Sequence, residues 1–186
     1  YEPYRYHQLN TGSARKEEVP AEEPQKQWRK NEKEKPEEFF LVDGYNIIFA
    51  WDELRALAEL NLDSARDRLM DICCNFQGFH GATLILVFDA YKVKGGQRSV
   101  QKYHNIYVVY TKEAETADQY IEKTVHEIGK KHRVTVATSD ALEQMIIWGD
   151  GAVRLSARGF HDAVEAASQR MRETYPGDGK LANSVR

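Results

Sequence analysis

The alternation of hydrophobic and polar residues changes character at Phe39. Between residues 11 and 38 the chain is dominated by Lys, Glu, Gln and Pro, and Val19 and Trp28 are almost its only large apolar side chains. Such a segment buries too little apolar surface to offset the entropy that is lost on ordering. We therefore predict a disordered linker over residues 1–38, of the kind that follows an upstream domain.

From Phe39 to about Thr174 the pattern is that of one folded domain. Residues 83–88 form a continuous apolar run, which is typical of a strand buried on both faces. Residues 64–79 instead place their apolar side chains at helical spacing. By these criteria, strands are predicted over residues 39–42, 83–88, 105–110, 133–137 and 153–155, and helices over residues 54–60, 64–79, 116–131, 141–148 and 160–173. Residues 175–186 have no periodicity and are predicted to be a flexible C-terminal tail.

Small and polar residues mark the expected ends of these elements. The first strand is expected to run into a turn at Asp43-Gly44, after which the apolar residues 47–49 continue the same buried stretch. Asp63 stands where the N-cap of the second helix belongs, and Gly78 and Gly81 stand where that helix should end.

The predicted strands alternate with helices, which indicates an α/β fold. We expect a central, mainly parallel sheet of five strands with helices on both faces. In folds of this class, ligand sites lie beyond the carboxyl ends of the strands. Residues at those ends are therefore the first candidates for function.

Four aspartates fall at that edge of the predicted sheet. Asp43, Asp89 and Asp140 follow the first, second and fourth strands, and Asp118 begins the helix after the third strand. Carboxylates gathered so closely repel one another and call for a counter-charge. Oxygen ligands of this kind favour Mg²⁺ or Mn²⁺, and such an ion can activate water against a phosphodiester. The pattern predicts a metal-dependent centre.

Each aspartate also has a local structural explanation. Asp43 would serve in an Asp-Gly turn, and Asp89 would cap the loop after its strand. Asp118 would favour the positive end of its helix, and Asp140 would be an N-cap with Glu143 completing a capping box. Each of these explanations is sufficient for its own aspartate. Coincidence is the weaker account of the set only because all four aspartates fall at the same edge of the predicted sheet.

Charge and composition limit the other functions that need to be considered. The net charge of -3 argues against a generally basic, nucleic-acid-coating surface. However, residues 90–112 contain no acidic side chain and include Lys94 and Arg98, which are candidates for holding phosphates. A solvated loop would explain the same stretch equally well. Asp-x-Asp phosphatase, dinucleotide, P-loop and serine- or cysteine-nucleophile motifs do not occur.

Cysteine usage and hydropathy bear on the compartment. Cys73 and Cys74 are adjacent and sit in a helical pattern, so they are expected to be small buried residues in a reducing cytoplasm. The longest apolar runs are too short to span a bilayer, so we expect no membrane association.

Four motifs in order carry a family resemblance. They are Leu-Val-Asp-Gly-Tyr-Asn-Ile-Ile at 41–48, Val-Phe-Asp-Ala at 87–90, Tyr-Thr-Lys-Glu-Ala-Glu-Thr-Ala-Asp at 110–118 and Thr-Ser-Asp-Ala-Leu-Glu-Gln at 138–144. The set resembles the YacP-like branch of the NYN domains, which belong to the PIN-like metal-dependent nucleases. The resemblance covers Phe39 to roughly Glu173.

The resemblance implies a three-layer, Rossmann-like PIN fold and an endoribonuclease that uses Mg²⁺ or Mn²⁺. It further implies a single-stranded RNA substrate, in particular mRNA, with the ribosome as a partner. The alternative is an inactive RNA- or ribosome-binding module of nuclease-like fold. The four aspartates would be both the metal ligands and, together with Asn46, the catalytic residues.

The resemblance also implies roles for residues around the aspartates. Asn46 would orient substrate or a metal-bound water, Glu115 would be an accessory acid, and Ser139 would contribute its hydroxyl or backbone N–H to substrate binding. Trp51, just past the first motif, is a departure from the family pattern, and it would either fill the core or stack on a base.

Overall fold

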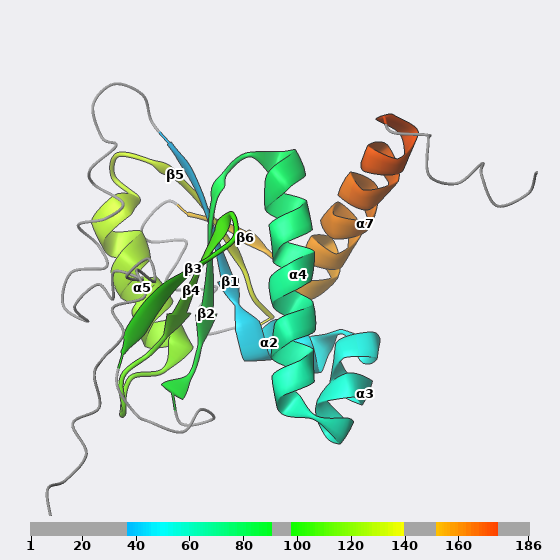
Figure 1. The fold of residues 1–186 in the computed structure, drawn as a ribbon. Coiled ribbons are helices and arrows are strands. Elements are labelled where there is room, and N and C mark those ends of the chain that lie inside the picture. Colours follow the sequence, from blue (N-terminus) through cyan, green and yellow to red (C-terminus); the bar gives the residue numbers. More distant parts are fainter. Residues whose placement is uncertain (1–36, 91–97, 140–151, 175–186) are drawn as a thin grey trace, which may run out of the picture.

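The computed structural model shown in Figure 1 describes residues 37–90, 98–139 and 152–174. Its strands are β1 (Glu38–Asp43), β2 (Thr83–Phe88), β3 (Ser99–Tyr103), β4 (Ile106–Tyr110), β5 (Arg133–Ala137) and β6 (Val153–Leu155). Its helices are α2 (Gly44–Ala50), α3 (Asp52–Leu60), α4 (Leu62–His80), α5 (Ala117–Ile128) and α7 (Ala157–Thr174). The helix predicted over residues 141–148 lies outside the described residues, as do the C-terminal tail and almost all of the predicted linker.

The strands form one sheet in the order β3-β4-β2-β1-β5-β6. Every neighbouring pair is parallel except β3 with β4, which is antiparallel. The mainly parallel α/β sheet is therefore confirmed, but the predicted number of five strands is wrong because β3 adds a sixth. Gln101 and Lys102 of β3 are exposed at the edge of the sheet, so this strand lacks the apolar run that marks the buried strands.

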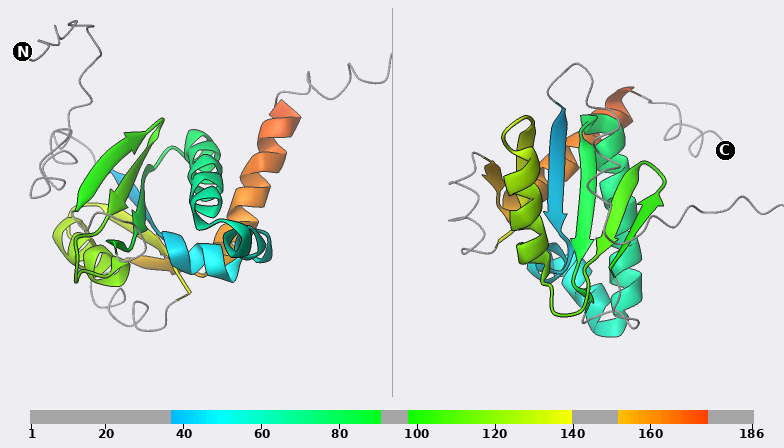
Figure 2. Two further views of the ribbon diagram at one scale, coloured as in Figure 1. Left: turned by 60° about the horizontal axis from the view of Figure 1, so that its bottom comes forward. Right: turned by 90° about the vertical axis from the view of Figure 1, so that its left-hand side faces the viewer.

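Helices cover both faces of the sheet, which gives three layers (Figures 1 and 2). Side chains at alternate positions of the strands point to opposite faces. Phe40 and Val42 of β1 pack in a core with residues of α2, α3, α4 and α7, whereas Phe39 and Leu41 pack in a second core with residues of α5. The continuous apolar strands thus supply both cores at once.

The first turn of the domain differs from the prediction. Residues 44–50 form helix α2 directly after β1, and not a turn followed by a continuing strand. Ile47 and Ile48 are both fully buried in the same core. A short apolar run suits a buried helix as well as a buried strand, so the pattern alone does not separate the two.

The start of α4 also corrects a prediction. Asn61, and not Asp63, is the N-cap, and its Oδ1 accepts a hydrogen bond from the backbone N–H of Ser64 at 3.1 Å. Asp63 lies in the first turn and pairs with Arg66. The predicted end is confirmed at Gly81, which has a left-handed φ of 85°.

Among the helices of the described ranges, none has both the length and the apolar character that a membrane span requires.

Candidate active site at the carboxyl edge

The carboxyl ends of β1, β2 and β5 meet at one edge of the sheet, at the bottom of Figure 1. Asp43 is the last residue of β1, is 7% exposed, and lies opposite Val87 of β2 in the strand register. Asp89 directly follows β2. Because the chain leaves β1 for β2 on one side and returns to β5 on the other, β1 and β5 flank the switch point where ligands bind in such sheets.

Asp89 is tied to the helix that carries Asp118. Its Oδ1 accepts a hydrogen bond of 2.7 Å from the backbone N–H of Ala117, the first residue of α5. Asp118 is the next residue and stands in the first turn of that helix. A carboxylate at the amino end of a helix is also stabilised by the helix dipole. The structure therefore brings Asp89 and the start of α5 together at the edge where Asp43 ends β1.

A buried threonine that the sequence did not single out holds this loop in place. Thr111 is fully buried, and its backbone N–H donates to the carbonyl of Phe88 at 3.0 Å. Its hydroxyl donates to the carbonyl of Glu115 at 2.7 Å and accepts from the N–H of Ala90 at 3.0 Å. In the sequence, Thr111 was marked only by its place after a predicted strand and within the third motif, at 110–118. Thr111 sets the path from β4 to α5, and so the place of Asp118.

Asn46 and Ser139 are in direct contact across 93 positions of the chain. Asn46 Oδ1 accepts hydrogen bonds from both the backbone N–H and the hydroxyl of Ser139, each at 2.6 Å. These two bonds use both lone pairs of Oδ1, which leaves the Nδ2 group of Asn46 to donate to a substrate. Asp140 is the next residue after Ser139 and lies outside the described residues.

Tyr45, inside the Asp-Gly-Tyr-Asn motif, connects this edge to α4. Its hydroxyl accepts a hydrogen bond of 3.0 Å from Nη1 of Arg66. Burial raises the pKa of Tyr45 above its ordinary value, and the Arg66 guanidinium partly offsets that rise. The negative charge of Asp89 raises the same pKa further, so Tyr45 is a neutral hydroxyl close to the acidic edge. Arg66 gave no signal in the sequence because its partner stands 21 positions earlier.

Arg98 and Glu115 form a largely buried ion pair. Their side chains are 8% and 11% exposed, Arg98 Nε donates to Glu115 Oε1 at 3.1 Å, and Nη2 contacts Oε2. The guanidinium also lies 5.6 Å from the centre of the Tyr120 ring. In this structure Arg98 therefore anchors the loop before α5 through Glu115. Lys94, the other candidate for holding phosphates, lies outside the described residues.

Replacing Arg98 with Met is expected to destabilise the fold by about 3 kcal/mol or more, because it leaves the Glu115 carboxylate buried without its partner. Thermal unfolding measures this loss. The double variant Arg98→Met with Glu115→Gln should recover much of the stability. If Arg98→Met unfolds like the parent and only binds RNA more weakly, the guanidinium serves the substrate and not the ion pair.

Trp51 is a residue of the core. It is 7% exposed, its Nε1–H donates to the carbonyl of Ala157 at 2.8 Å, and its ring lies 5.3 Å from that of Phe160. The indole therefore joins α2 and α3 to α7 and is not exposed for a base to stack on.

The chemistry of the donors fits a hard divalent cation, since carboxylate oxygens are the ligands that Mg²⁺ and Mn²⁺ prefer. Within the ranges that the structure describes, no three His, Cys, Asp or Glu side chains stand close enough to hold an ion. That search does not include Asp140.

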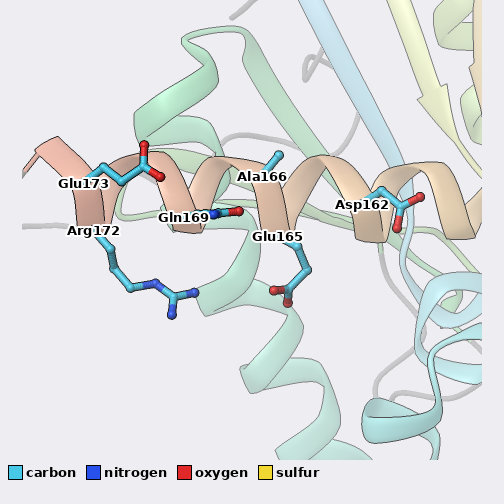
Figure 3. Close-up of a pocket in the computed structure, with 6 residues that line it drawn as sticks. All are labelled: Asp162, Glu165, Ala166, Gln169, Arg172 and Glu173. Atoms are coloured by element: carbon cyan, nitrogen blue, oxygen red, sulfur yellow. The ribbon is translucent and has the colours of Figure 1, made fainter.

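Two hollows in the described surface lie elsewhere. One, of about 610 Å³, is lined by residues of α7 only, which Figure 3 shows along one helix. The other, of about 160 Å³, lies among Trp51, Arg68 and His161. Neither is lined by a residue of the carboxyl edge.

Comparison with known proteins relates this edge to a family. The profile of the YacP-like NYN domain matches residues 40–184. The Bacillus subtilis (strain 168) protein YacP, which is described as uncharacterized, is 42% identical over 135 residues, covering 72% of this chain and 79% of that protein. The crystal structure of Rae1 (YacP) from Bacillus subtilis has a TM-score of 0.64 at 41% identity, covering 73% of this chain and 78% of that one. The crystal structure of a point mutant of the same Bacillus subtilis protein has a TM-score of 0.63 at 38% identity, covering 73% and 79%. The chain therefore belongs to the YacP-like NYN domain family, as its four motifs predicted.

Proposed function

We propose that this protein is a metal-dependent endoribonuclease that hydrolyses phosphodiester bonds of single-stranded RNA. The observation that carries the proposal is the convergence of Asp43, Asp89 and the start of α5 at one edge of the sheet. Membership of a family with a nuclease-like fold supports the same reaction class. The substrate we propose is mRNA on the ribosome, in the cytoplasm.

The proposed ligands of Mg²⁺ or Mn²⁺ are Asp43, Asp89, Asp118 and Asp140. An ion bound there would supply an activated water and stabilise the negative charge that builds on the phosphate. The burial of Asp43 limits competing hydration of its carboxylate. Asp89 is oriented by the N–H of Ala117, which directs one oxygen toward α5.

The polar neighbours of the aspartates would position the substrate. Ser139 fixes the Oδ1 side of Asn46, so the Nδ2 group of Asn46 would donate to a phosphate oxygen. The carboxylate of Glu115 is engaged in the ion pair with Arg98. As an accessory acid, Glu115 would therefore act indirectly, by holding the loop before α5 in place. Tyr45 would keep its proton at neutral pH, because its pKa is raised.

The parent protein is expected to cut a labelled single-stranded RNA in the presence of Mn²⁺ or Mg²⁺, and to lose that activity in EDTA. Gel analysis of the products, with and without ribosomes, measures both the reaction and its setting. Internal cuts that depend on the metal support the endonuclease, and a further need for ribosomes supports action on translated mRNA. Absence of cleavage under every one of these conditions would contradict the proposal.

The second candidate is a module that binds RNA or the ribosome without cutting. The hydrogen bond from Ala117 to Asp89 favours it, because that bond gives the carboxylate a structural task that needs no metal. Thermal unfolding with added Mn²⁺ separates the two. An ion at 100 times its dissociation constant adds about 2.7 kcal/mol to the free energy of unfolding, which raises the Tm by several degrees. No shift with either metal, together with retained RNA binding, would favour the binding module.

A further inference from the structure

Phe49 is a large apolar side chain that stands partly in solvent beside the candidate active site. It belongs to α2, the helix that begins at the carboxyl edge, and it is 43% exposed. The same helix buries Ile47 and Ile48 completely. The exposed ring therefore lies on the other side of a helix whose inner side is already packed.

Helical geometry places Phe49 next to the motif residues. Tyr45 and Asn46 precede it by four and three positions, and side chains at these spacings are neighbours on a helix surface. The rise of roughly 1.5 Å per residue puts the Phe49 backbone about 4.5 to 6 Å further along the axis. Asn46 is held by Ser139, and Tyr45 follows Asp43, the last residue of β1, by two positions. Phe49 thus lies one turn away from the proposed site of cleavage.

The ring of Phe49 rests on a rigid support. Its centre lies 6.4 Å from that of Tyr45, with the two planes inclined by only 24°. Tyr45 is itself buried, packs against Phe88 at 5.1 Å and accepts a hydrogen bond from Arg66. A ring fixed in this way loses little freedom when a flat partner stacks on it.

We propose that Phe49 is a stacking platform for an unpaired base of the RNA next to the bond that is cut. The inference rests on the proposed function and adds a substrate contact to it. An unpaired base suits this position because it has a flat apolar face for Phe49, whereas its sugar and phosphate reach toward polar groups. Such groups are present one turn back along α2, at Asn46 and its partner Ser139. Phe49 therefore takes the role that the sequence left open for Trp51.

Binding of a fluorescein-labelled single-stranded RNA of about 12 nucleotides, within the length that such grooves track, tests the platform apart from the chemistry. Both proteins in this measurement are full chains that carry Asp43→Asn, so that the RNA stays intact. One of them also carries Phe49→Leu, and the two dissociation constants are compared. Leu keeps the apolar character and approximate size of the residue but has no ring face. We expect Phe49→Leu to weaken binding by about tenfold, since removal of one stacked ring costs roughly 5- to 150-fold. Phe49→Trp should restore binding.

Phe79 offers a matched control. It is 42% exposed, carries Arg170 at 6.0 Å from its ring, and stands at the far end of α4, which runs away from the carboxyl edge in Figure 1. Phe79→Leu should bind RNA like the parent. A base analogue, 2-aminopurine, placed in the RNA should show fluorescence quenching on binding that Phe49→Leu reduces and Phe79→Leu does not.

The outcomes separate this inference from the proposed function. Equal binding by Phe49→Leu and its parent, while the protein with Asp43 intact still cuts RNA, would overturn the platform alone. Equal losses in Phe49→Leu and Phe79→Leu would overturn it as well, because they would reflect general weakening. If Phe49→Leu weakens binding to a single-stranded DNA of the same sequence as much as it weakens binding to the RNA, the result supports stacking, which does not need the 2′-hydroxyl. If the parent binds no single-stranded nucleic acid, the platform is rejected, and the cleavage assay decides the nuclease separately.

Discussion

Replacing Asp43 with Asn is expected to reduce metal-dependent RNA cleavage by more than about 100-fold while the fold stays intact. Loss of a residue that only supports a metal ligand already costs roughly 10- to 100-fold, so loss of a ligand itself should cost more. Asn has the size of Asp, and it can accept the hydrogen bonds of a buried strand end without the charge. Initial rates of RNA cleavage with Mn²⁺, together with circular dichroism and thermal unfolding, measure both parts of this expectation.

Asp89 needs two substitutions because it has a structural contact as well as a proposed chemical role. Asp89→Asn keeps an Oδ1 acceptor for the N–H of Ala117, whereas Asp89→Ala removes it. If the charge matters for cleavage, Asp89→Asn should lose activity as Asp43→Asn does while unfolding like the parent. Glu173→Gln, an exposed change in the last turn of α7, should alter neither property. Wild-type cleavage by Asp89→Asn, combined with instability of Asp89→Ala, would restrict Asp89 to holding the loop.

Gly44→Ala is expected to be the most damaging single-methyl change in the described part of the site. A Cβ at this position would lie 2.5 Å from Cδ1 of Phe88, nearer still to its Cε1, and 2.9 Å from the carbonyl oxygen of Val87. The contact with Val87 is with backbone of a central strand, which cannot turn aside. Overpacking of this kind costs about 1–3 kcal/mol, and at this site the cost should be near the upper end. Differential scanning calorimetry should show the Tm lowered by several degrees.

Gly78→Ala is the matched control for this prediction. Gly78 lies within α4, and a Cβ there would meet only Asn105 Nδ2, at an ordinary 3.7 Å. Ala is favoured over Gly inside a helix, so Gly78→Ala should be neutral or stabilising by about 0.5–1 kcal/mol. Because Gly44 begins the helix that carries Asn46, Gly44→Ala should also lower cleavage by the folded fraction. A Gly44→Ala protein as stable as the parent would mean that α2 and β2 separate freely, contrary to the packing described above.

Some helices and strands could be predicted from the sequence alone, because the pattern of adjacent residues is enough to indicate them. The strand over residues 83–88 and the strand over residues 133–137 have the predicted bounds. Apolar or β-branched residues dominate these strands, and such runs indicate burial without reference to distant parts of the chain. A run of this kind that is buried in a parallel sheet has few other conformations open to it. The end of α4 at Gly81 was predictable for the same reason, since a left-handed residue favours Gly at that one position.

The candidate site was predictable to the extent that it depends on topology. Alternation of strands and helices places the residues after parallel strands at one edge, and Asp43 and Asp89 do stand there. The contact between Asn46 and Ser139 was not predicted, because it depends on β1 and β5 being neighbours, and the strand order is seen only in the structure. The metal itself, and the roles given to the aspartates, stay predictions.

Features that depend on partners far apart in the chain were decided only when the helices packed on the sheet. The polar edge strand β3 is a strand because β4 pairs with it, and its own residues do not signal one. Trp51 is buried because Ala157 and Phe160 meet it, whereas Phe49, two residues earlier, is left exposed. Local patterns report whether a residue is apolar or polar, but which partner it meets is set by the free energy of packing the whole domain.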